Sequence, residues 1–215
     1  MQKDLEISVK RLFIILILVS LFSGSCKKDE EENPVDDSMI LEEYFDESSK
    51  WPEFDNESAA AFIEDGKYYF EHKTEDPNRS YSMYYYRDLK NIYTMETSIS
   101  LLEGSEDFRY GIIYFFKDNY NHHYLYINHN RFFIGYVYNY NYHVICDYTE
   151  SDAINIDEKP NIIKMVINSK HVDFFINNTK VYEYDVSFFT GDEFGYKFAS
   201  KGKVAIDYLK VFRHH

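Results

Sequence analysis

From Leu41 onward the chain is a succession of short runs rich in β-branched and aromatic residues, and no long amphipathic helix interrupts them. Clusters of Asn, Asp, Gly and Lys separate the runs, and such clusters favour turns. The pattern predicts an all-β fold, an antiparallel β-sandwich that forms one domain over residues 41–213. The predicted strands span residues 41–45, 60–63, 67–72, 80–87, 92–101, 109–117, 122–129, 131–138, 142–148, 161–168, 171–176, 179–184, 193–199 and 203–212.

The composition favours strands over disorder. Aromatic residues make up 19% of the chain, with 22 Tyr and 18 Phe, while the mean hydropathy is −0.50. Aromatic residues are enriched in strands and depleted in disordered segments. A domain of this size buries roughly 70% of the surface of its unfolded chain, which is enough for one stable core.

Two short turns predict β-hairpins. Asn177 and Asn178 stand between two strand-like runs and can both adopt positive φ, as a two-residue hairpin loop requires. A second break lies at or near His129 and Asn130. The length of that turn decides which side chains of the two flanking strands stand opposite one another.

The N-terminus resembles the signal peptide of a bacterial lipoprotein. Basic residues precede an apolar stretch over residues 12–22 that is too short to span a membrane, and three small residues then lead to Cys26. The resemblance implies cleavage of residues 1–25, attachment of a diacylglycerol to the Cys26 thiol, and acylation of the new amino group, with palmitate as an acyl chain. The alternative is an ordinary secretory signal peptide with an incidental cysteine, or an uncleaved anchor.

The lipidated cysteine would open an acidic linker over residues 26–40, in which two lysines are followed by one aspartate and three glutamates. This order resembles the export tag that directs some lipoproteins of Gram-negative bacteria to the outer face of the outer membrane. It implies a lipid-anchored protein exposed at the cell surface, with the membrane as a partner through the anchor. A solvated spacer that its charges keep extended is the alternative.

The charge balance excludes one class of partner. Removal of residues 1–25 takes away three basic and two acidic side chains, so the formal charge changes from −14 to −15. Such an acidic surface repels phosphate backbones, and nucleic acid is therefore not expected as a partner. Cys146 is the one cysteine left when Cys26 is lipidated, so the domain is expected to depend on packing rather than on a disulfide.

The order of segments in the domain resembles that of concanavalin A-like and laminin G-like jelly rolls, and most of all that of secreted keto-disaccharide hydrolase domains. The segments are Trp51, AFIEDGKYYF, RYGIIYFFKDNYNHHYLYIN, NIIKMVINSKHVDFFINNTKVYEYD, FFTGDEFGYKF and VAIDYLKVF. The resemblance covers about residues 41–213 and implies a jelly-roll fold. It rests on patterns rather than on invariant motifs, so it carries no activity with it.

One segment resembles a glycoside hydrolase motif but lacks one of the carboxylates that the reaction needs. Glu183 and Asp185 share one face of a strand, as in the Glu-x-Asp-x-x-Glu motif of concanavalin-like β-glucanases, which the segment resembles. The position of the second glutamate, the proton donor, is occupied by Phe188. Retaining hydrolysis needs both carboxyl groups, so the pair is interpreted as solvated and the protein as non-catalytic.

Cysteine and histidine chemistry is also weakly indicated. His143 and Cys146 are three residues apart, which would place them on opposite faces of a regular strand unless a bulge intervenes, and Cys146 is interpreted as a buried free thiol. His122 and His123 are adjacent and should diverge, while His171 is isolated. No transition-metal site is therefore expected from the sequence.

Calcium is the one cofactor that the sequence leaves open. Many jelly rolls hold a structural calcium ion near their first and last strands, and Asp46 and Asp207 stand at comparable places. Carboxylate and carbonyl oxygens are the ligands that calcium prefers. A structural rather than catalytic ion is the expectation.

A tyrosine-rich face is the strongest candidate for ligand binding. Along residues 122–129, Tyr124 and Tyr126 alternate with Leu125 and Ile127, and the second pair is predicted to face the core. Flat phenol rings flanked by amides can stack on the apolar face of a pyranose; simple packing is the alternative. The predicted ligand-binding residues are Tyr124, Tyr126, Asn128, Arg131, Tyr136 and Tyr138.

The length of the turn near His129 and Asn130 decides which side chains of the second strand lie beside these tyrosines. With a two-residue turn, Tyr126 faces Phe133 and Tyr124 faces Gly135, and one further turn residue would place Ile134 and the following tyrosine there instead. The segment YVYNYNYH, residues 136–143, adds an aromatic and amide-rich tip that suits a ligand loop or an interaction surface.

Three functions remain open. The first is a surface-anchored, non-catalytic carbohydrate-binding module, the second a structural or protein-interaction lipoprotein that docks an outer-membrane protein, and the third a glycoside hydrolase-like enzyme.

Overall fold

The computed structural model describes residues 38–46, 48–49, 51–75, 80–85, 92–157 and 159–213, all within the second of the two units into which the chain divides, Asp36–His215. The predicted signal peptide, Cys26 and most of the acidic linker lie outside the described residues. No helix in the described part is long and apolar enough to cross a bilayer. The strands are β1 (Ser38–Glu43), β2 (Phe54–Asp55), β3 (Ala59–Glu64), β4 (Lys67–His72), β5 (Ser80–Tyr85), β6 (Ile92–Gly104), β7 (Arg109–Asp118), β8 (Asn121–Asn128), β9 (Arg131–Tyr138), β10 (Asn141–Glu150), β11 (Asn161–Asn168), β12 (His171–Ile176), β13 (Thr179–Asp185), β14 (Glu193–Ala199) and β15 (Gly202–Arg213).

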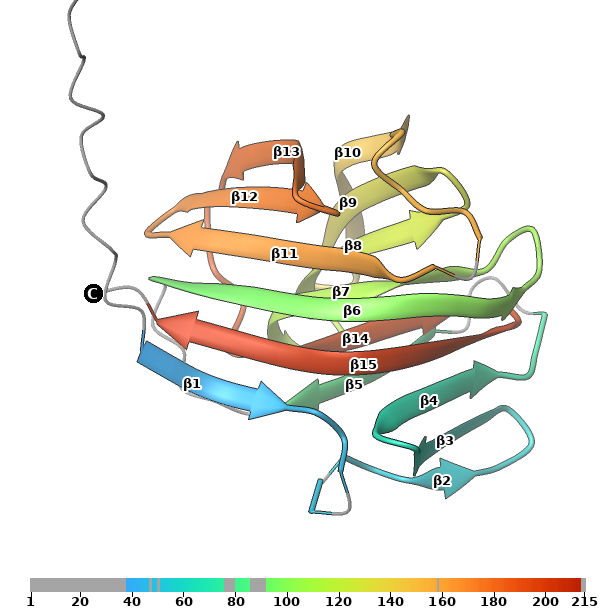
Figure 1. Ribbon diagram of the computed structural model, residues 1–215. Helices are drawn as coiled ribbons and strands as arrows, with labels where there is room; N and C mark the ends of the chain where they lie inside the picture. The colour runs from blue at the N-terminus through green and yellow to red at the C-terminus, as the bar shows by residue number, and fades with distance from the viewer. Residues whose placement is uncertain are drawn as a thin grey trace, which may run out of the picture. The chain divides into compact units, whose positions relative to one another are not determined.

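Among the described residues the strands form two antiparallel sheets, packed as two layers (Figure 1). The larger sheet has the order β13-β12-β11-β6-β15-β4-β3-β2, and the smaller has the order β10-β9-β8-β7-β14-β5. Strand β15 pairs with β6 along one edge, while its other edge is shared by β4 near Gly202 and by β1 near Arg213. The predicted antiparallel β-sandwich is confirmed.

Alternating side chains build the core between the sheets. In β11 the residues at every second position are buried, and Ile163, Met165 and Ile167 are fully enclosed. In β14 of the other sheet, Phe194 and Tyr196 point into the same core. Each fully buried side chain of this size contributes roughly 1.5–3 kcal/mol to folding, so the period-two pattern is what holds the layers together.

Buried polar groups in this core are paired across the layers. Thr97 of β6 donates from its hydroxyl to the carbonyl of Tyr208 at 2.7 Å, so the hydroxyl of Tyr196, 2.7 Å away, donates to Thr97. The Asn161 amide donates to the Tyr110 hydroxyl at 3.0 Å. Since an unpaired buried polar group costs about 1–3 kcal/mol, these bonds allow tyrosine to serve as a core residue.

Both predicted hairpin turns are confirmed. Asn177 and Asn178 have φ of 50° and 65°, and the flanking strands pair directly across them. The turn between β8 and β9 has two residues, and its first, His129, has φ of 52°. Tyr124 therefore stands opposite Gly135, which is the first of the two registers considered above.

Gly135 leaves room for the ring across from it. A Cβ atom at Gly135 would lie 3.1 Å from the Tyr124 hydroxyl and 2.8 Å from the carbonyl oxygen of His143. The second distance involves backbone, which cannot move aside as a flexible side chain can. Only glycine fits at this crossing of β8, β9 and β10.

The adjacent histidines of β8 diverge, as predicted. His122 lies on the outer face beside Phe116 and Tyr124, whereas His123 points inward and stacks on Tyr136 with ring centroids 5.1 Å apart. Burial, aided by the charge of Lys197, lowers the pKa of His122 to about 4. Burial, aided by His122, lowers the pKa of His123 to about 3.

These two pKa values predict acid sensitivity. An unfolded histidine takes up a proton near pH 6.5, whereas both folded imidazoles stay neutral to lower pH, so the unfolded chain binds more protons between these limits. The stabilisation is complete above pH 6.5 and is lost as pH falls toward the folded pKa values. From pH 7 to pH 5 each buried histidine should lower the free energy of unfolding by about 2 kcal/mol.

Urea denaturation of wild type and His123→Phe at pH 7, 6 and 5 measures this loss. The variant should lose about 2 kcal/mol less than wild type over this range. Equal losses in the two proteins would show that His123 is protonated in the folded state at pH 5.

Candidate functional site

The six residues predicted to bind ligand lie on two faces of the smaller sheet. Tyr124 and Tyr126 lie on the outer face of the smaller sheet, in an apolar cluster separate from the core between the sheets. Asn128 and Arg131 are paired beside them, and the Arg131 guanidinium donates to the Asn128 amide oxygen at 3.1 Å. Tyr136 and Tyr138 instead turn to the inner side, where each contacts the ring of Phe188.

The outer-face rings are packed rather than open. Tyr124 and Tyr126 are 6% and 4% exposed. The ammonium of Lys197 lies 5.6 Å from the centre of the Tyr124 ring, and the guanidinium of Arg109 lies 5.7 Å from that of Tyr126. Burial, with the nearby charge of Arg109, lowers the pKa of Lys197 to about 8. Little ring surface remains for a ligand, so the alternative of simple packing describes these two tyrosines.

Exposed tyrosines gather instead where the strands of the smaller sheet end. Tyr120 and Tyr140 lie in two neighbouring turns, at residues 119–120 between β7 and β8 and at residues 139–140 between β9 and β10, while Tyr138 ends β9 on the inner side and Tyr142 lies near the start of β10 on the outer side. The backbone N–H of Asn139 donates to the Asn121 side chain at 3.3 Å and joins the turns. We call this group the tyrosine tip; its members and exposed fractions are Tyr120 (47%), Tyr138 (44%), Tyr140 (69%) and Tyr142 (78%).

Tyr140 occupies a backbone conformation that a bulky residue rarely adopts. Asn139 and Tyr140 have φ of 48° and 68°, the pattern of a hairpin turn in which glycine is preferred at the second position. A side chain with a Cβ atom raises the energy of this conformation by roughly 1–2 kcal/mol. The ring nevertheless stands in solvent and meets Tyr120, with centroids 3.9 Å apart. Phe45 and Phe115 also have positive φ but are buried in the core, so exposure of the ring is what sets Tyr140 apart from them.

The tip combines ring faces with amide groups. Asn141 donates from its side chain to the Asn139 carbonyl at 3.0 Å, and the Asn121 amide donates to Asp118 at 2.8 Å. These contacts hold the amides in place beside the rings. Apolar ring surface bordered by oriented hydrogen-bonding groups suits a ligand with both apolar and hydroxyl-bearing edges.

The glucanase-like carboxylates lie away from the tyrosine face. Glu183 and Asp185 point outward from the larger sheet, because the intervening Tyr184 packs into the core. Glu183 pairs with Lys180, and Asp185 lies 2.8 Å from His171. Phe188 packs against the inner-side tyrosines as described above. The two carboxylates are thus held in ion pairs on the opposite layer from Tyr124.

The aspartates predicted to bind calcium have other partners. Asp207 lies 2.8 Å from the ammonium of Lys67 and accepts a hydrogen bond from Ser98 at 3.0 Å. Asp46 accepts bonds from the backbone and the hydroxyl of Ser48, at 2.8 and 2.6 Å. Asp207 thus takes part in an ion pair between strands β4 and β15, and Asp46 is held by its own turn.

A bulge corrects one expectation about Cys146. His143 pairs with Tyr136 and Cys146 with Ile134, with a shift of register between them, so both point to the same face instead of opposite ones. The thiol is half-buried and lies 3.5 Å from the Thr149 hydroxyl, while the His143 ring stacks on Tyr136 at 4.5 Å. Each group therefore has its own neighbour, and no nucleophile and base pair is formed.

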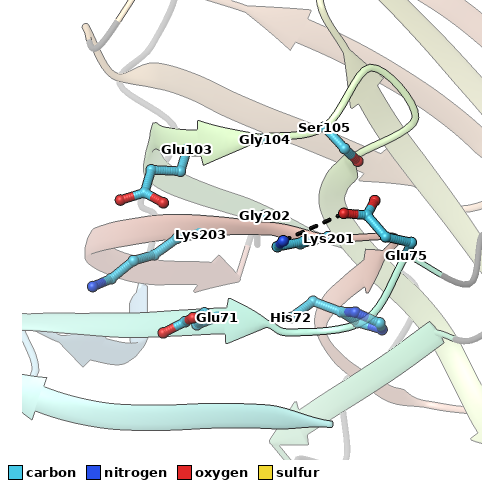
Figure 2. Close-up of a pocket in the computed structure, with 9 residues that line it drawn as sticks. All are labelled: Glu71, His72, Glu75, Glu103, Gly104, Ser105, Lys201, Gly202 and Lys203. Atoms are coloured by element: carbon cyan, nitrogen blue, oxygen red, sulfur yellow. Dashed lines mark ion pairs between the residues drawn. The ribbon is translucent and has the colours of Figure 1, made fainter.

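A polar hollow of about 290 Å³ lies where β4, β6 and β15 meet (Figure 2). Lys201 and Glu75 form an ion pair at 3.4 Å across it. The described residues that line the hollow include no tyrosine, phenylalanine or tryptophan, so they offer no stacking surface for a sugar. The lining residues are Glu71, His72, Glu75, Glu103, Gly104, Ser105, Lys201, Gly202 and Lys203.

Comparison with known proteins identifies the fold. No family model matches the chain, and no curated protein matches it. The laminarinase catalytic domain of Thermotoga maritima superposes with a TM-score of 0.59 at 10% identity, over 84% of this chain and 99% of that one. Laminarinase from Flavobacterium sp. UMI-01 gives 0.58 at 13% identity, over 82% and 100%.

A third match is part of a larger protein. The GH43 protein BlXynB of Bacillus licheniformis gives a TM-score of 0.62 at 14% identity, over 80% of this chain and 39% of that one. This chain has the concanavalin-like β-sandwich fold. At such low identity the likeness extends to the fold alone.

Two variants at Tyr140 isolate the backbone strain. Tyr140→Ala and Tyr140→Gly both remove the ring, but only glycine relieves the positive φ. The glycine variant should have a free energy of unfolding about 1 kcal/mol higher than the alanine variant in urea denaturation. Equal stabilities would mean that the turn relaxes to negative φ once the ring is gone.

Proposed function

We propose that this protein is a bacterial surface lipoprotein that binds glycan without hydrolysing it, and that the tyrosine tip is the binding site. The observation that carries the proposal is the Tyr140 ring, 69% exposed on a backbone with positive φ. A turn that served only to connect two strands would be more stable with glycine there.

The chemistry of the tip suits a sugar. A pyranose offers an apolar C–H face that stacks on a phenol ring and a rim of hydroxyls that bonds to amides. Tyr120 and Tyr140 supply rings, and Asn121 and Asn141 supply side-chain amides in the same group of turns. The similar folds named laminarinase and GH43 also support a role with glycans.

Binding fits the described residues better than hydrolysis. A retaining glycosidase needs two carboxyl groups about 5 Å apart on either side of the bond that it cleaves. Glu183 and Asp185 are engaged with Lys180 and His171 on the larger sheet, and Phe188 stands where the motif would have its proton donor.

The proposed location follows from the N-terminal sequence. Lipidation of Cys26 would anchor the chain, and residues 26–40, fully extended, would reach at most about 50 Å from the membrane. The lysine and acid run would direct the anchored protein to the outer face of the outer membrane. The domain would then meet polysaccharide outside the cell.

Protein interaction is a second candidate, favoured by the edge strand of the smaller sheet. β10 is the terminal strand of that sheet, and its Tyr142 and Val144 are 78% and 62% exposed. An exposed edge strand with apolar side chains can pair with another chain. An outer-membrane protein recovered with the wild-type protein but not with Val144→Lys would favour this function.

Glycan binding is tested with the mature protein on an array of plant and host polysaccharides, followed by titration with the best ligand. Tyr140→Gly should weaken binding by roughly tenfold or more, as expected for loss of a central aromatic contact. The control is Tyr44→Gly, which removes another exposed tyrosine, 48% exposed, from beside Tyr208 of the larger sheet. Absence of any ligand, or unchanged affinity in Tyr140→Gly, would contradict the proposal.

Anchoring and location are tested separately. Cys26→Ser should abolish incorporation of labelled palmitate and release the protein from the membrane fraction, because the thiol is the proposed acylation point. Protease added to intact cells should degrade the wild-type protein. Degradation only after lysis would refute surface exposure and leave lipidation standing.

A further inference from the structure

We infer that the outward face of the β12–β13 hairpin is a binding site for a transition-metal dication of the Zn²⁺ class, with His171, Asp173 and Glu183 as ligands. One ligand atom from each of these residues lies within 4.8 Å of the others. Within the described residues, these three are the group of His, Cys, Asp and Glu side chains whose ligand atoms lie close enough together to hold one metal ion. The site is independent of the tyrosine tip.

Strand register brings the ligands together. His171 pairs with Asp185, and Asp173 pairs with Glu183, across the two strands. Because Val172 and Phe174 point into the core, the four pairing residues all stand on the outer face. The turn at 177–178 and a one-residue bulge beside it, where Phe175 pairs with Lys180 but Phe174 pairs with Tyr182, together set this register.

The imidazole is already oriented for metal binding. Nδ1 of His171 lies 2.8 Å from Asp185, and Nε2 faces the other two carboxylates, 3.2 Å from Asp173 and 3.9 Å from Glu183. A histidine that ligates a metal through one nitrogen commonly donates its other N–H to a carboxylate, which fixes the ring. Asp185 fills that supporting role here, and Nε2 remains directed at the acidic pair.

The same space already holds a cation. The Lys180 ammonium lies 2.7 Å from Asp173 and also pairs with Glu183. Its side chain is 42% exposed and can turn to solvent. The cluster therefore favours positive charge, and a dication would replace one ammonium group.

The donor set selects the class of metal. One imidazole and two carboxylates suit borderline ions such as Zn²⁺, whereas Ca²⁺ and Mg²⁺ prefer oxygen ligands throughout. Three protein ligands leave a fourth position of a tetrahedral Zn²⁺ open to water.

The test is a calorimetric titration of the mature protein with Zn²⁺, with Ca²⁺ and Mg²⁺ as comparison ions. Because the chain ends in His214 and His215, all proteins carry alanine at both positions. One saturable Zn²⁺ site is expected, and His171→Ala should weaken it at least tenfold, since it removes the only nitrogen ligand. His129→Ala, an exposed histidine in another hairpin, is the matched control and should leave the affinity unchanged.

Lys180→Ala separates a metal site from a network of ion pairs. If the cluster binds metal, removal of the competing ammonium group should tighten Zn²⁺ binding severalfold and raise the Zn²⁺-dependent increase in Tm. Failure of Zn²⁺ to bind either protein, or binding that His171→Ala leaves unchanged, would overturn the inference. Stronger binding of Ca²⁺ than of Zn²⁺ would overturn the assigned class of metal.

Discussion

Packing between the inward faces of the two sheets determines where every other group can stand. Tyr196 of β14 bonds to Thr97 of β6 across the core, and Ile163 and Phe194 are enclosed between the layers. Once these side chains face inward, their neighbours along each strand must face outward. The buried outer tyrosines, the tyrosine tip and the His171 cluster all take their positions from this division.

Much of the fold could be predicted because strand patterns are local. Residues 161–168 alternate with period two, and Asn177 and Asn178 mark a hairpin by their tolerance of positive φ. The two-residue strand β2 is too short to show any period. The bulge near Cys146 also escaped prediction, because a single inserted residue reverses the faces without a distinct sequence signal.

The candidate sites were harder to predict because they depend on contacts between distant segments. The alternation of Tyr124 and Tyr126 correctly indicated the outer face, but Lys197 and Arg109, which cover those rings, come from other strands. His171 is isolated in sequence and meets Glu183 only through pairing of β12 with β13. The aromatic and amide-rich segment 136–143 was the one local signal that led to an exposed group.

The positive φ of Tyr140 affects which residues selection would retain at this position of the turn. Most substitutions there that retain a Cβ atom keep the strained backbone, whereas glycine relieves it. In a lineage that no longer used the ring, mutation would therefore tend to bring glycine or asparagine to this position. Conversely, an aromatic residue retained there across diverged relatives would record continued selection against the more stable alternative.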